Sequence, residues 1–411
     1  MRGRSRQVTK KKGKPQQIFL LEEDRINPAA DAFEKRFAIT HSGKRMLRMV
    51  SILLAVCIAA VFLHYDFIHE PVSLSRYIST VQDRFSSFWF LLTGNGDQNA
   101  VLLRIVTITC AAVTGAALSV CGGVCQGIYH TPMASPSMLG INSGGMMAAV
   151  IYLLIYGEAN ESYEYYSFEE YNNYLSSLSF YEIYGRQIWM FCGCLLGASL
   201  VIFISTRAGK GRVSTVILIL SGVLFSSLSN AVVSLAQYYF TYVDSTTDRL
   251  FAVMAISMGS FAGVYQPVHL LMYALPVVVC ILILIRSAPG LNVLMFGDEE
   301  AAALGMKVAR FRNNMFLISV LACSFILCFC GNIGFVGLIV PHLARQMAGS
   351  DYRRMLPETA FLGAIIMVVT NFFALCTGLS SSMNVVTSVT GSLLTIMFVL
   401  RYRRERNADW A

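Results

Sequence analysis

Charged residues are scarce in this chain: they make up 14% of its 411 residues, whereas a soluble protein carries about 25%. Hydrophobic residues make up 55%, so the composition excludes a soluble globular protein. Apolar runs recur, each close to the roughly 20 residues with which a helix crosses a bilayer. We therefore expect an all-α, polytopic integral membrane protein with about ten transmembrane helices. The predicted spans are 46–64, 101–123, 138–156, 187–205, 214–238, 266–287, 313–330, 333–347, 358–378 and 384–400.

Several functional patterns are also missing. The spans hold almost no acidic residue, which argues against an ion-coupled secondary transporter, because such proteins place Asp, Glu or His within spans. The sequence contains no G-x-x-x-x-G-K-[ST] loop and no H-E-x-x-H, the motifs of P-loop ATPases and of zinc proteases. We therefore expect no catalytic residue, no metal and no cofactor bound by this chain.

Basic residues gather in every second connection between the predicted spans, while the other connections carry Asp and Glu. This alternation follows the positive-inside rule. It predicts a multi-pass protein of the cell membrane with both termini in the cytoplasm. It also assigns the net charge of +8 to membrane orientation rather than to nucleic-acid binding. The basic connections lie at 10–14, 44–45, 207–212, 307–312, 345–354 and 401–406.

The domain organisation follows from these runs. We expect a basic, disordered tail at 1–45, with no secretory signal peptide because no apolar segment precedes residue 46. A transmembrane domain at 46–405 contains an acidic, Tyr-rich outer insertion at 158–186, and a short cytoplasmic tail follows at 406–411. The 11 cysteines lie in or at the ends of apolar runs, which favours packing residues over disulfides or metal ligands.

The segment 331–345, G-N-I-G-F-V-G-L-I-V-P-H-L-A-R, combines glycines at a spacing of three with a proline. Small residues at helical spacing let helix backbones approach closely in a bilayer. Pro341 removes one intrahelical donor and bends the segment. We expect a close-packed membrane helix that is bent at one end, which suits a moving pore better than an inert anchor.

The segment 297–305, G-D-E-E-A-A-A-L-G, predicts a short helix between two spans. Asp298 is expected to be its N-cap. Glu299 and Glu300 suit the first turn, where the helix dipole favours negative charge, and Gly305 suits a left-handed stop. Its small apolar face fits a helix-in-groove contact; an ordinary solvated connector is the alternative.

The segment 122–145 holds prolines at 132 and 136, which predict a rigid turn between the second and third spans. Gln126, Asn142 and Ser143 place polar groups at the membrane boundary. Lining of a pathway and hydrogen bonding between helices explain them equally well at this stage.

The three segments, in their order along the chain, resemble those of the permease subunits of type II ABC importers for ferric siderophores, haem or cobalamin (FecCD-type iron-chelate permeases). The pattern of that family around the second and third helices is G-x-x-x-Q-x-x-x-x-N-P-L-A-x-P-x-x-L-G-x-x-x-G. Thr131 replaces its asparagine and Met133 replaces the leucine that follows proline. The stretch 380–386 lacks the Pro-x-Gly turn that usually opens the last helix. Positions that keep the pattern are Gly122, Gln126, Pro132, Ala134, Pro136, Leu139, Gly140 and Gly144.

The resemblance implies a bundle of ten helices that pairs with a second permease subunit, as a homodimer or a homologous heterodimer. It also implies two cytoplasmic ABC ATPase subunits, which hold ATP and Mg, and an extracytoplasmic substrate-binding protein. A ferric siderophore is the expected cargo, with haem or cobalamin as alternatives. A purely structural scaffold would need neither the capped cytoplasmic helix predicted at 297–305 nor glycine-broken spans.

The resemblance assigns four groups of residues. The ATPase-coupling group is Asp298, Glu299, Glu300, Ala301, Ala302, Leu304, Gly305 and Met306. The cytoplasmic-gate group is Thr131, Met133, Ser214 and Thr215. Residues of the pathway or of helix packing are Gln126, Asn142, Ser221, Ser226, Asn230, Gly334, Gly337 and Pro341. The outer arginines expected to meet the binding protein are Arg76, Arg84 and Arg249.

Overall fold

The computed structural model describes residues 46, 48–60, 98–131, 134–157, 180–208, 215–243, 247–261, 264, 267–377, 379 and 381–393. The basic tail at 1–45, Arg76 and Arg84, most of the insertion at 158–186, and the residues from 394 onward therefore lie outside the described residues, apart from the insertion's end at 180–186. Contacts divide the chain into Met1–Arg48 and Met49–Ala411. The second of these units is the subject below.

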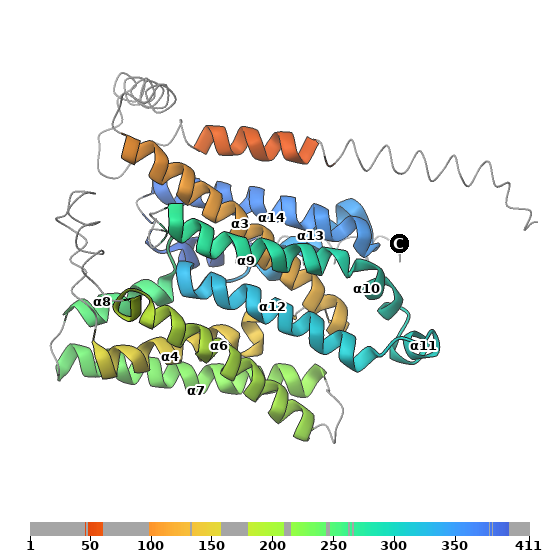
Figure 1. Ribbon diagram of the computed structural model, residues 1–411, viewed down its shortest axis with the longest axis horizontal. Coiled ribbons are helices and arrows are strands. Elements are labelled where there is room, and N and C mark those ends of the chain that lie inside the picture. The colour runs from red at the N-terminus through yellow and green to blue at the C-terminus, as the bar shows by residue number, and fades with distance from the viewer. Residues whose placement is uncertain are drawn as a thin grey trace, which may run out of the picture. The chain divides into compact units, whose positions relative to one another are not determined.

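The described residues are helical and contain no strand, so the all-α prediction is confirmed (Figure 1). Shorter helices at Arg48–Ala60 and 383–393 accompany the labelled ones. The labelled helices are α3 (Gln98–Tyr129), η1 (Pro136–Leu139), α4 (Ile141–Tyr156), α6 (Phe180–Ala208), α7 (Thr215–Tyr242), α8 (Thr247–Met258), α9 (Pro267–Arg286), α10 (Ala288–Leu294), α11 (Asp298–Ala303), α12 (Val308–Cys330), α13 (Val336–Ala348) and α14 (Tyr352–Cys376).

Six of the described helices are long and apolar enough to cross a membrane: α3, α6, α7, α9, α12 and α14. Each of the ten predicted apolar runs holds helix in its described part. The sequence did not predict α8 or α10 as helices. Large apolar side chains on α7, among them Leu220, Leu224 and Leu228, are exposed in the single chain, as expected of a surface that faces lipid or another membrane helix.

Glycines set how closely α3 packs. This helix contacts α9, α12, α13 and α14 (Figure 1). A Cβ added at Gly122 would overlap the Gly337 carbonyl of α13, and one at Gly115 would overlap the Gly363 carbonyl of α14. Only a residue without a side chain fits where two helix backbones meet at this distance.

A second close contact joins α4 to α6. A Cβ at Gly144 would overlap the Gly193 carbonyl, and Gly140 adopts a φ of 83° where η1 passes into α4. The turn predicted from the prolines is therefore a 3₁₀ turn that ends on a left-handed glycine. This turn sets the direction in which α4 begins, so that α4 packs against α6.

The segment 331–345 differs from its prediction as one glycine-spaced helix. Helix α12 ends at Cys330, Gly331 has φ 69°, Phe335 has φ 65°, and α13 begins at Val336. Left-handed residues do not continue a right-handed helix, so Gly331 and Gly334 lie in an extended break. Pro341 is buried inside α13, which continues to Ala348; the apolar run is not broken at the proline.

Backbone hydrogen bonds hold this break in place. The Asn332 N–H donates to the Ile256 carbonyl of α8 at 2.9 Å, and the Ser260 N–H donates to the Cys330 carbonyl at 2.9 Å. The Met383 N–H donates to the Gly259 carbonyl at 2.9 Å. The end of α8, the break and the start of the helix 383–393 thus form one junction.

Candidate functional site

The α10–α11 segment (288–305) lies at one end of the helix bundle, opposite α8 (Figure 1). Gly297 is the N-cap of α11, with φ 118°, so the prediction that Asp298 caps this helix is wrong. A Cβ at residue 297 would overlap the Glu300 carboxylate, and glycine alone adopts this backbone without strain. Asp298 is then the first helical residue, and its side chain points to other elements. The left-handed Gly305, φ 84°, ends the segment as predicted.

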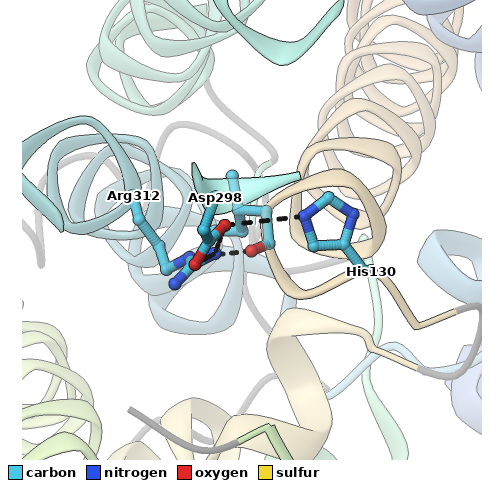
Figure 2. A network of polar contacts seen from close by, with 4 residues as sticks. His130, Asp298 and Arg312 are labelled. Atoms are coloured by element: carbon cyan, nitrogen blue, oxygen red, sulfur yellow. Dashed lines mark hydrogen bonds and ion pairs between the residues drawn. The ribbon is translucent and has the colours of Figure 1, made fainter. Parts of the chain in front are cut away.

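Asp298 takes part in a network that joins three elements (Figure 2). Arg312 of α12 donates through Nη2 to both carboxylate oxygens of Asp298, at 2.9 and 3.1 Å. Its Nε donates to the Ile128 carbonyl in the last turn of α3 at 2.8 Å. His130 Nε2 lies 3.9 Å from Asp298 Oδ1. The last four carbonyls of a helix have no intrahelical partner, so Arg312 supplies a missing donor and a favourable positive charge.

Apolar side chains of the α10–α11 segment divide between two sides. Ala301 is fully buried, which seats α11 on the bundle. Phe296 and Leu304, by contrast, are 75% and 72% exposed. Exposed large apolar groups beside polar ones are typical of an interaction surface. Sequence reasoning selected Leu304 but missed Phe296, although a large apolar residue directly before the charged stretch 298–300 was a usable signal.

A second polar contact fixes α10 to α14. Asn292 donates to Asp351 Oδ1 at 2.6 Å and accepts from the Tyr352 N–H at 2.9 Å. Asp351 is also the N-cap of α14, where it accepts from the Arg353 N–H at 3.0 Å. The α10–α11 segment is therefore attached to three long helices, α3, α12 and α14, through side chains.

Asp351→Ala is expected to destabilise the protein by about 0.5–2 kcal/mol, because both the cap and the Asn292 contact are lost. Thermal unfolding of the detergent-solubilised protein measures the effect. Arg354→Ala, an exposed change in the first turn of the same helix, is the matched control. Equal unfolding temperatures for the two variants would contradict the role of this cap.

The predicted gate residues are only partly described. Thr131 is half-buried and lies two residues beyond the end of α3, and its carbonyl accepts from the Ala134 N–H at 3.3 Å. Met133 and Ser214 lie outside the described residues, and of Thr215 only its place at the start of α7 is described. Of the four residues predicted for the gate, Thr131 is therefore the one whose side chain the structure describes.

The predicted pathway residues of α3 and α4 make contacts between helices. Gln126 is buried and donates to the Leu338 carbonyl of α13 at 3.1 Å. Asn142 donates to Asn332 Oδ1 at 2.7 Å, and Ser143 donates to the Ser226 hydroxyl at 2.7 Å. These contacts are the hydrogen bonds between helices that the sequence offered as the alternative to lining of a pathway.

The remaining residues of that group divide between core and surface. On α7, Ser221 is buried, Ser226 is half-buried and Asn230 is exposed. Gly334, in the break, and Gly337, in α13, line a pocket together with Asn142 and residues of η1. The pocket lies where η1 meets the junction between α12 and α13, and the polar side chains that line it include Ser135, Ser137 and Asn142.

Arg249 is the described member of the outer arginines. It lies in α8, with its guanidinium carbon 6.0 Å from the centre of the Phe240 ring. A Cβ at Gly157 would approach its Nη2 to 2.7 Å. Arg249 therefore lies beside the end of α4. The helix that carries it, α8, lies at the opposite end of the bundle from α11 (Figure 1).

Comparison with known proteins settles the class of this helical bundle. The model of the FecCD transport family matches residues 50–401. The chain belongs to the FecCD transport family. As a FecCD protein it is a permease of the ABC importer type and a multi-pass membrane protein, in agreement with the resemblance of its three motifs.

Relatives of this FecCD chain are named for different cargoes. It is 32% identical to the cobalamin import system permease protein BtuC of Halobacterium salinarum, over 74% of this chain and 73% of the relative. It is 29% identical to the hemin transport system permease protein HmuU of Yersinia pestis, over 79% and 90%. It is 30% identical to the molybdate import system permease protein MolB of Haemophilus influenzae, over 74% and 80%.

The FecCD fold is also found in a solved structure, described as an inward-facing conformation of a metal-chelate type ABC transporter. The likeness has a TM-score of 0.66 and 25% identity, and covers 87% of this chain and 99% of the other. The bundle of helices around α3 is thus an ABC transporter fold.

Proposed function

We propose that this permease carries a ferric siderophore chelate into the cytoplasm, driven by ATP hydrolysis on separate ATPase subunits that dock on the α10–α11 segment. The observation that carries the docking proposal is the pair of exposed apolar residues, Phe296 and Leu304, on a segment fixed by side-chain contacts to α3, α12 and α14. An exposed apolar face on a firmly held support is the arrangement that helix-in-groove recognition uses.

The cargo proposal rests on likeness to transporters of metal-containing compounds. The similar solved structure is described as a metal-chelate type transporter, and relatives are named for cobalamin and hemin. Haem and cobalamin are therefore the second candidates. The small and polar residues of α4 and α7, such as Ser143 and Ser226, would offer a large chelate weak hydrogen bonds without a tight site.

The complete importer is proposed to contain a second permease chain, either a copy of this one or a homologue, and an extracytoplasmic binding protein. Two ATPase subunits would supply the bound ATP and Mg. The exposed apolar side of α7 offers a surface for a partner helix in the bilayer, and Arg249 offers a charge for a carboxylate of the binding protein.

Cellular uptake tests the cargo. A strain whose only route is this permease with its ATPase and binding protein should accumulate the label of a radiolabelled ferric siderophore, and not the label of labelled haem or cobalamin. The same strain without the permease is the control. Accumulation of haem or cobalamin alone would replace the siderophore as cargo, and uptake of the siderophore that persists without the ATPase would contradict the ATP-driven mechanism.

A further inference from the structure

We infer that Arg312 is the positioning residue that transmits movement of α11 to the end of α3 and to the proposed gate at Thr131. This inference rests on the proposed function, because it assigns a route for the movement that ATPase docking would start. It concerns the contacts made by Arg312 on the inner side of α11, and not the docking surface itself.

The guanidinium of Arg312 is shared between two elements. Nη2 holds the Asp298 carboxylate and Nε holds the Ile128 carbonyl, at 2.9 and 2.8 Å. The Arg312 side chain is 15% exposed, whereas that of Asp298 is 49% exposed. A guanidinium is planar and its donors have fixed directions, so Asp298 and Ile128 cannot shift independently while both bonds persist (Figure 2).

The chain beyond Ile128 leads directly to the gate. Tyr129 closes α3 with its ring edge-on to Phe316 of α12, at 6.2 Å between ring centres. His130 follows with φ 49°, a left-handed turn that ends the helix, and Thr131 comes next. Two residues thus separate the carbonyl held by Arg312 from Thr131, so a displacement of that carbonyl must reach the start of this loop.

No other described side chain joins α11 to α3 by a charge-assisted hydrogen bond of this length. His130 approaches Asp298 only to 3.9 Å, which is longer than a hydrogen bond. Asn292 and Asp351 attach α10 to α14, on the other side of the segment. Among the described contacts, the Asp298–Arg312–Ile128 bridge is therefore the direct polar connection between the proposed docking helix and the proposed gate.

Thiol labelling at the gate tests the inference without knowledge of the cargo. Thr131→Cys is introduced into a Cys192→Ser background, because Cys192 is the exposed native cysteine. Membranes that contain the permease with its ATPase are treated with a membrane-impermeant maleimide, with and without ATP and vanadate. We expect nucleotide to change the rate of labelling by about fivefold or more, the range of typical coupling between sites.

Arg312→Lys is expected to abolish this nucleotide effect while the ATPase stays bound and hydrolyses ATP. Lysine keeps the charge but, as a point donor on one atom, does not hold the carboxylate and the carbonyl in fixed directions. Arg310→Lys, an exposed change in the same helix turn, should keep the full effect. If Arg312→Lys does not reach the membrane, Asp298→Asn breaks the ion pair at a half-exposed side chain and should reduce the effect.

Three results would overturn the inference, and they are distinguishable. A full nucleotide effect in Arg312→Lys shows that transmission does not use the bridge. An absent effect in the reference protein, with ATPase bound and active, shows that the loop at Thr131 does not respond to α11. Failure of any ATPase to bind the reference protein removes the proposed function, and the inference with it.

Discussion

Gly122→Ala is expected to destabilise the protein strongly, although alanine is the better helix former by about 1 kcal/mol. The added methyl group would overlap the Gly337 carbonyl and come within 2.7 Å of the Gly337 Cα. Backbone atoms cannot rotate away as a side chain does, so α3 and α13 must separate. Overpacking of this kind costs about 1–3 kcal/mol, occasionally more, and we expect Gly122→Ala at the upper end.

Gly123→Ala is the matched control, one residue along the same helix. Its methyl group would meet the ends of two flexible side chains, Met355 Cε at 3.1 Å and Leu356 Cδ2 at 3.3 Å. Those atoms can shift by rotation, so the gain in helix propensity should offset the contact and leave stability nearly unchanged. Thermal unfolding of the two purified variants measures the difference, and equal unfolding temperatures would contradict the close approach of α3 and α13.

Phe296→Glu combined with Leu304→Glu is expected to prevent the ATPase from binding, and transport should be lost with it. Burial of a large apolar side chain contributes about 1.5–3 kcal/mol. Loss of two such side chains at a docking surface would lower affinity roughly a hundredfold or more. The permease should still reach the membrane, because both residues are exposed in the single chain.

Co-purification of the ATPase with the tagged permease measures this effect, with transport assayed in parallel. The control pairs Phe296→Leu with Leu304→Met, which keeps an apolar surface of similar size and should retain most binding. An ATPase that still co-purifies with the Glu variant would show that docking occurs elsewhere on the chain.

The helical class and the position of α11 could be predicted from sequence because they depend on local properties. Apolar runs separated by charged connections define the spans, and the left-handed stop at Gly305 follows from glycine alone. The boundaries of α9 at 267 and 286 differ from the predicted 266–287 by one residue at each end. A helix can be predicted from composition wherever an apolar run is long and contains few polar residues.

The contacts of Asp298 could not be predicted in the same way. Local capping rules selected Asp298 as the N-cap, but the cap position went to Gly297 because the chain enters α11 with φ 118°. The Asp298 carboxylate instead meets Arg312, which only tertiary packing brings within reach. The end of α12 at Cys330 agrees with the predicted span 313–330, but the extended conformation at 333–335 was missed. Non-local hydrogen bonds hold this break, since Asn332 N–H donates to Ile256 of α8 and Ser260 N–H donates to Cys330.

The junction of α8, the break at 331–335 and the helix 383–393 is built from main-chain hydrogen bonds. Every residue type except proline carries the same N–H and C=O groups, so such a junction survives most substitutions. The departure of 380–386 from the Pro-x-Gly turn of its family thus need not alter how the last helix begins. Substitution in this junction is restricted mainly at Gly259 and Gly331, because their positive φ values and the backbone atoms that face them leave no room for a Cβ.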